Sequence, residues 1–239
     1  MPPIPQPPYT IKLYPQSTLL SQPFLTDLQT TINTSYHNLP SHSNPNPKTN
    51  TRLKTPTQLP TELTKSGITA IAFLPDPKST IIGTASIKPY THDGPESDSI
   101  WKVPGHFARF TAEELGSGSK AVLDSVDDRS SDVDLDLGIG CDCECECEGE
   151  FEIVAVAVLP AYRGLGVAGE LVRVCEEEAR KRGGEEGRVR SRIHVRAVRD
   201  VVGGYWGRRG FVVVGELYCP PFTWGLERGF VLWEMVREL

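Results

Sequence analysis

One stretch of the sequence, residues 150–182, constrains the fold more than any other. Residues 151–158 form a near-continuous apolar run, which predicts a strand buried on both faces and therefore central in its sheet. Pro160 cannot continue a strand ladder, and the two glycines that follow it allow the backbone to turn closely. Apolar residues at helical spacing over 167–182 then predict an amphipathic helix. The stretch is predicted to fold as strand, turn and helix.

The start of this predicted helix is a candidate phosphate site. Several N–H groups at a helix start have no intrahelical partner, and the macrodipole adds partial positive charge, so an anion is stabilised there. The pattern P-x-x-R-x-x-G-x-A is formed by Pro160, Arg163, Gly166 and Ala168. A Rossmann loop is a competing prediction, but it needs G-x-G-x-x-G and an acidic residue after the next strand, whereas this next strand is arginine-rich. A turn without a ligand is the other alternative.

At these residues the sequence resembles the GNAT superfamily of N-acetyltransferases, whose acyl-CoA signature is R/Q-x-x-G-x-G/A after a strand. The resemblance implies acetyl-CoA as cosubstrate and an acetyl carbonyl polarised by a strand N–H near Val158. It implies that strand backbone pairs with the pantetheine arm at Val156, Ala157 and Val158. It also implies that the CoA pyrophosphate is held by the turn residues Arg163, Gly164, Leu165, Gly166, Val167, Ala168 and Gly169.

The resemblance further implies an α/β (α+β) fold, with a mixed, mostly antiparallel central sheet flanked by helices. One such domain is expected over residues 9–239, after a Pro-rich tail at 1–8. Hydrophobic patterns predict further strands at 9–14, 68–74, 80–88, 191–198, 211–215 and 229–236, the last pairing antiparallel with the one before it. They predict helices at 19–36, 59–65 and 200–210.

Residues 91–149 are predicted to be a long, largely disordered acidic insertion. Its composition is too polar and repetitive to offset the entropy of ordering. Near its end, over 141–148, cysteines alternate with acidic residues. Zinc ligands within a pair are usually two to four residues apart, so we interpret this spacing of one as a solvated repeat rather than a metal or redox site. An acidic loop could also steer a cationic acceptor toward the site.

Composition narrows the class of protein. The formal net charge of -6 over 239 residues argues against general nucleic-acid binding, which needs a basic face. The first residues lack the apolar core of a signal peptide, and no apolar run approaches a membrane span, so we expect no membrane partner and a cytoplasmic or nuclear location. In such a compartment the six cysteines are expected to be thiols.

The expected chemistry is acyl transfer from a thioester to a primary amine, which attacks only when neutral, so a nearby base helps. Glu152 is the predicted base. It begins the central strand, is expected to share a face with Val154, Val156 and Val158, and matches the position of the catalytic glutamate in the histone-acetylating branch of the superfamily. The alternative is a strand-edge carboxylate facing solvent.

Tyr205 is the predicted proton donor to the departing thiolate. A second resemblance, to the superfamily pattern A-x-x-F-Y-x-x-x-G-F, ends at Gly210 and Phe211 and puts Trp206 where the frequently catalytic tyrosine stands. In the strand before it, His194 and Arg196 are predicted on one side, as a solvated face or as contacts to CoA phosphates.

Two functions therefore remain open at this stage. The first is an acetyl-CoA-dependent N-acetyltransferase in which a small-molecule or protein amine attacks directly in a ternary complex. The second is a non-catalytic acyl-CoA-binding or interaction module. The C-terminal residues 220–236 resemble those of fungal members of the superfamily.

Overall fold

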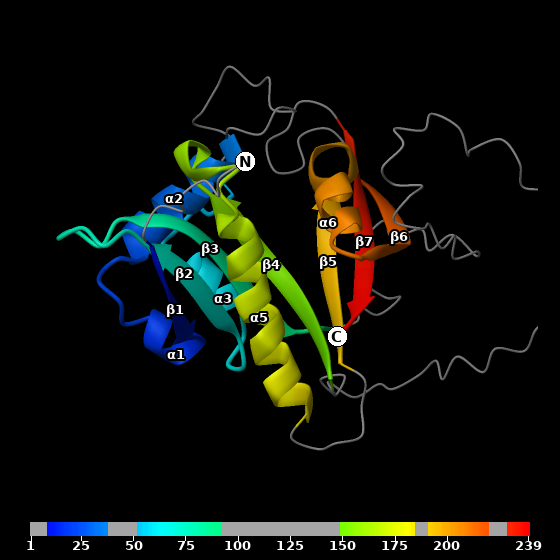
Figure 1. Ribbon diagram of the computed structural model, residues 1–239, viewed down its shortest axis with the longest axis horizontal. Helices are drawn as coiled ribbons and strands as arrows, with labels where there is room; N and C mark the ends of the chain where they lie inside the picture. Colours follow the sequence, from blue (N-terminus) through cyan, green and yellow to red (C-terminus); the bar gives the residue numbers. More distant parts are fainter. Residues whose placement is uncertain (1–8, 38–51, 92–148, 185–190, 220–228) are drawn as a thin grey trace, which may run out of the picture.

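The computed structural model describes residues 9–37, 52–91, 149–184, 191–219 and 229–239, which form a seven-stranded sheet with helices on both faces (Figure 1). The strands are β1 (Thr10–Pro15), β2 (Ile68–Phe73), β3 (Ile81–Pro89), β4 (Glu150–Val158), β5 (Arg192–Val198), β6 (Val212–Cys219) and β7 (Phe230–Glu238). The helices are α1 (Gln16–Leu19), α2 (Leu25–His37), α3 (Gln58–Glu62), α5 (Val167–Gly184) and α6 (Gly204–Arg208). Two short helical turns, η1 (Pro160–Tyr162) and η2 (Arg199–Gly203), precede α5 and α6.

The strands follow the order β1-β2-β3-β4-β5-β7-β6. Only the β4–β5 pair is parallel, and the other five pairs are antiparallel. This confirms the predicted mixed, mostly antiparallel sheet. β7 pairs antiparallel with β6, as expected, but it also lies between β5 and β6 and joins them.

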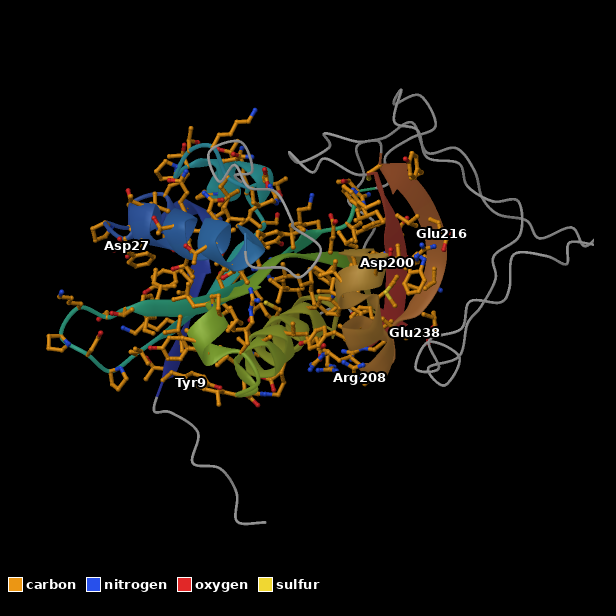
Figure 2. The ribbon with its side chains drawn as sticks, turned by 90° about the horizontal axis from the view of Figure 1, so that it is seen from above. Tyr9, Asp27, Asp200, Arg208, Glu216 and Glu238 are labelled. Carbon is orange, nitrogen blue, oxygen red and sulfur yellow. The ribbon has the colours of Figure 1, made fainter. Side chains whose placement is uncertain are left out.

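Each face of the first strands has its own core. On β2, Ile68, Ala70 and Ala72 pack in the cluster that includes α5, whereas Ile71 and Phe73 pack in the cluster that includes α2. Seen from above, α2 and α5 lie on opposite sides of these strands (Figure 2). Because both faces are covered, every residue of β2 is buried, which explains its continuous apolar sequence.

The single helix predicted over 19–36 is wrong, because the structure has α1 and α2 with a break between them. Pro23 lies in that break. Proline has no N–H to donate within a helix, and it disfavours helical geometry at the residue before it. The break lets α2 begin at Leu25 and cover its own face of the sheet.

A β-bulge in β4 changes which side chains share a face. Ala155 has a positive φ of 52°, and the β3–β4 register shifts beside it. Val154 packs in the α2 cluster, whereas Val156 and Val158 pack in the α5 cluster. The expectation that Glu152 shares a face with all three valines is therefore wrong beyond Val154, because the extra residue of the bulge reverses the alternation.

Several predictions fall outside the described residues. They are the tail at 1–8, nearly all of the insertion predicted at 91–149, and the alternating cysteine tract at 141–148. Among the residues that are described, no helix is both long enough and apolar enough to cross a membrane.

Candidate active site

The candidate site lies where β4 and β5 diverge. The two strands pair in parallel only from Glu150↔Arg192 to Ile153↔Val195, and beyond these residues they separate (Figure 1). Within the described structure, the β5-facing edge of residues 154–158 therefore has no strand partner. This edge includes the predicted pantetheine-binding residues Val156, Ala157 and Val158. Unpaired strand backbone of this kind can hydrogen-bond an extended ligand.

The turn after β4 supplies unpaired amides. Gly164 and Gly166 have positive φ values of 76° and 80°, a conformation that side chains other than glycine rarely adopt. The first backbone bond of α5 runs from the N–H of Glu170 to the carbonyl of Gly166. In the part of the chain described, the N–H groups of residues 164–169 donate no hydrogen bond outside the helix itself. A Cβ at Gly164 would meet nothing within 4 Å, so the space beside this turn is open.

Arg163 holds the turn in place. Its Nε donates to the carbonyl of Val158 at 3.2 Å, and its Nη2 donates to the carbonyl of Ser35 at 2.6 Å. The side chain therefore ties the end of β4 to α2. Ser35 was not among the predicted site residues, because a backbone acceptor leaves no signal in the sequence. Val167 is buried in the core, so only its backbone is available to a ligand.

Arg209 brings a positive charge to the first turn of α5. A Cβ on Gly169 would lie 3.4 Å from Arg209 Nη1, so this glycine allows the guanidinium to approach the helix closely. Arg209 Nη2 also lies 3.6 Å from Glu176 Oε1. The sequence analysis did not select Arg209, although a guanidinium beside a helix start is suited to an anion.

Tyr205 lies on the α5 side of the sheet. Its ring packs edge-to-face against Trp206, with ring centroids 5.1 Å apart, and Arg209 lies over its face at 5.8 Å. The hydroxyl is buried and makes no hydrogen bond within the described residues. Burial raises the pKa of Tyr205, and Arg209 opposes that shift. Trp206, which occupies the motif's tyrosine position, is itself buried against Phe211.

Glu152 lies on the opposite face from Tyr205 and is buried, with 5% of its surface exposed. Its Oε2 lies 3.3 Å from Lys88 Nζ, and its Oε1 lies 3.8 Å from Arg196 Nε. The alternative of a carboxylate facing solvent is therefore wrong. The solvated face predicted for the arginine-rich strand is also wrong at Arg196 and His194, because both turn toward carboxylates of neighbouring strands.

These residues belong to a larger group that we call the His194 cluster. Its members come from β3, the residue after β3, β4, β5 and β7, and they are Lys88, Tyr90, Glu150, Glu152, His194, Arg196 and Glu234. Burial would raise the pKa of Glu234, but His194, Tyr90 and Arg196 hold it below its usual value. Burial, followed by Glu234, raises the pKa of Tyr90.

Comparison with known proteins supports the fold. Residues 133–211, about a third of the chain, match the family described as the acetyltransferase (GNAT) family. This span covers the turn, both predicted catalytic residues and His194. No curated protein sequence is significantly similar to the chain.

Solved structures resemble the whole chain. A ribosomal-protein-alanine N-acetyltransferase from Brucella melitensis has 15% identity and a TM-score of 0.51, covering 96% of this chain and 99% of its own. An N-acetyltransferase from Staphylococcus aureus Mu50 has 11% identity and a TM-score of 0.51, with coverages of 97% and 98%. An aminoglycoside 6'-N-acetyltransferase complexed with coenzyme A has 11% identity and a TM-score of 0.50, with coverages of 96% and 96%. These similarities establish a GNAT-like fold.

Proposed function

We propose that this protein is a GNAT-family N-acetyltransferase that moves an acetyl group from acetyl-CoA to a primary amine by direct attack in a ternary complex. One observation carries the proposal: within the described residues, an edge of β4 without a strand partner runs directly into a turn whose amides donate no hydrogen bond outside the helix. Acetyl-CoA matches both features in that order. Its pantetheine arm, which ends in the thioester, suits the strand edge, and its pyrophosphate suits the turn. Coenzyme A in a protein of the same fold adds support.

The residues present fit acetyl-CoA. The backbone of Val156, Ala157 and Val158 would pair with the pantetheine amides, and a strand N–H near Val158 would polarise the acetyl carbonyl. The N–H groups of residues 164–169 would hold the pyrophosphate at the α5 start. Arg163 would act by fixing this turn, and Arg209 would add positive charge beside it.

The acceptor amine would approach from the face that carries Glu152, opposite the α5 side. Glu152 is the candidate base and Tyr205 the candidate donor to the thiolate. Because they lie on opposite faces, they could act together only through the divergence between β4 and β5. This arrangement suits direct transfer, in which the amine arrives from one side and the thiolate leaves on the other.

The alternative of a non-catalytic acyl-CoA-binding module is favoured by one feature. A buried Trp206 stands at the position of the motif's tyrosine, and the Tyr205 hydroxyl is enclosed. Such a module would bind acetyl-CoA at the same turn but release no free thiol with any amine.

Calorimetric titration with acetyl-CoA tests the shared premise. Gly166→Glu introduces a carboxylate beside the free amides, and we expect it to weaken binding by about 100-fold or more through charge repulsion. Gly166→Ala is the matched control, because it carries the strain of the positive φ without the charge. Wild-type protein that does not bind acetyl-CoA would refute both functions.

Release of thiol with an amine panel then separates the two functions, since only the acetyltransferase produces it. Two further expectations from the sequence remain predictions. They are the assignment to a fungal-type branch and the cytoplasmic or nuclear location.

A further inference from the structure

The proposed function does not use the buried imidazole of His194. Its side chain is 10% exposed, and neither ring nitrogen has a hydrogen bond within the described structure. The ring stacks on Tyr90 with centroids 3.7 Å apart. A buried polar group without a hydrogen bond costs free energy, so such an arrangement is uncommon unless another state of the protein uses it.

Each nitrogen of His194 faces a carboxylate. Nε2 lies 3.6 Å from Glu150 Oε2, and Nδ1 lies 3.6 Å from Glu234 Oε1. These separations are too long for hydrogen bonds but close enough for ion pairing. A proton added to either nitrogen would therefore meet a negative charge directly. Tyr90 donates its hydroxyl to Glu234 and so fixes one of the two carboxylates.

The other charges near the ring are held in ion pairs. Among the described residues, Lys88 and Arg196 lie beside Glu152, and Arg192 lies beside Glu150. A proton added to the imidazole would lie between the carboxylates of Glu150 and Glu234.

His194 is also close to the candidate site. It is the register partner of Glu152, one pair before the last β4–β5 pair at Ile153↔Val195. Neighbouring strands lie about 4.8 Å apart, and the two side chains share a face. Protonating Glu152 would leave Lys88 and Arg196 without their counter-charge in a buried site, which is costly. His194 makes no hydrogen bond among the described residues, so its protonation breaks none there.

We propose that His194 accepts the proton that the amine loses on attacking the thioester, an inference that rests on the proposed function. In this inference His194 replaces Glu152 as the base, and Glu152 keeps its charge and orients the amine or an intervening water. The ammonium first loses one proton to solvent, and the lone pair of the neutral amine forms the new C–N bond. The nitrogen then loses a second proton to His194, which passes it to solvent. The C–S electron pair leaves with sulfur, which takes a proton from Tyr205 that solvent replaces. The products are the amide, the free thiol and one proton.

His194→Gln tests this role, because glutamine keeps a polar side chain but does not titrate. We expect kcat to fall about 100-fold, as for loss of a general base, with the affinity for acetyl-CoA unchanged. The fall of wild-type kcat toward acidic pH should disappear in the variant, because glutamine, unlike histidine, does not take up a proton. A variant that keeps this acidic limb at the same midpoint would overturn the inference.

Glu234→Gln provides a second variant that leaves the histidine in place. Removing one counter-charge disfavours the imidazolium, so the acidic limb should move to lower pH. Lys181→Gln, which changes an exposed charge on α5, is the control and should leave the limb where it is.

Proton NMR of the imidazole gives a readout that does not need turnover. The His194 signal, identified by its loss in His194→Gln, should shift with pH over the same range as the acidic limb of kcat, and both should move together in Glu234→Gln. An imidazole that keeps one protonation state from about pH 5 to 9 would contradict the inference. If wild-type protein acetylates no amine, the proposed function fails and this role fails with it. If it does acetylate an amine and the NMR titration is absent, only this role fails.

Discussion

Two groups of charges around a buried carboxylate lie on opposite faces of the sheet, and they differ in which side chains surround that carboxylate. On the α5 face, Glu176 Oε1 lies 2.6 Å from Arg237 Nη2, and Arg237 also donates to the carbonyl of Arg209 at 2.7 Å and covers the ring of Phe211. On the other face, His194 lies 3.6 Å from each of two carboxylates without a hydrogen bond. The first group surrounds its carboxylate with two guanidinium groups, whereas the second also holds an imidazole between two carboxylates.

The difference shows that burial of charge does not by itself identify a reactive site. Glu152 and Glu176 each have 5% of their surface exposed, and each is paired with two cations. Among the described residues, only the cluster around Glu152 contains a nearby histidine, and its nitrogens make no hydrogen bond there. The following variants test whether the α5 face contributes mainly stability and the His194 face mainly reactivity.

Glu176→Gln should have the largest effect on stability. It leaves the partly buried Arg209 and Arg237 without a counter-charge, and we expect the free energy of unfolding to fall by about 3 kcal/mol, the lower end for a buried pair. Urea unfolding measures this change. Glu177→Gln is the matched control on the same helix, because Glu177 is about half exposed and its loss should cost less than about 0.5 kcal/mol. Equal effects of the two changes would refute the contrast.

Raising the pH should lower the free energy of unfolding because of Cys175, which is buried on the α5 face. Burial, with Glu176 adding to it, raises the pKa of this thiol from 9.0 to about 12. Below pH 9.0 the thiol is protonated in both states, so stability is unaffected; above it only the unfolded state ionises, and stability falls until about pH 12. We expect a loss of about 2 kcal/mol by about pH 10.5. Cys175→Ala should remove this part of the alkaline slope, and an identical slope would contradict the assignment.

Glu234→Gln should cost less stability than Glu176→Gln, about 1–2 kcal/mol at neutral pH. Because the pKa of Glu234 lies below its usual value, this carboxylate stabilises the fold above its unfolded pKa, and that contribution is lost as the pH falls through its folded pKa. When unfolding is measured from neutral to acidic pH, the free energy of unfolding should fall less steeply in the variant than in the wild type. A loss as large as that of Glu176→Gln would mean that both clusters are mainly structural.

Tyr90→Phe should have the smallest effect, about 1 kcal/mol or less, because the ring keeps its stacking on His194 and only the hydroxyl is removed. Its effect on kcat should be clearer than its effect on unfolding, since Glu234 is no longer held beside the imidazole. Unfolding and kcat measured on the same preparation check this. A stability loss of several kcal/mol with unchanged kcat would place Tyr90 with the structural residues.

The sequence predicted those parts of the fold that depend on local pattern. The strand, glycine turn and helix of β4 and α5 were predicted closely, because an apolar run, a proline and two glycines in order leave few alternatives. The prediction of one helix over 19–36 was wrong because it gave the apolar spacing on either side of Pro23 more weight than the proline itself. The predicted face of Val156 was wrong because the bulge depends on the positive φ of Ala155. An alanine in the sequence does not indicate a positive φ.

The candidate site was only partly accessible to the sequence. Glu152 and the glycine turn carry a local motif, so they could be proposed. The pairing of Lys88, Glu152, Arg196 and Glu234 depends on the register of four strands that are far apart in the chain. The side of β5 that carries His194 was predicted, but its burial was not, since it arises from Tyr90 and from carboxylates of β4 and β7.

The position of β7 has a consequence for the nascent chain. β5 pairs with β4 over four residues but with β7 over seven, and among the described strands β6 pairs only with β7. During translation β5 therefore emerges with only its short pairing to β4 and β6 emerges without a strand partner, and both must wait for a strand made after them. Glu234 arrives with that same strand, and so does Arg237, the partner of Glu176 on the α5 face. Both groups of charges around a buried carboxylate are consequently completed only when the last strand of the sheet has been made.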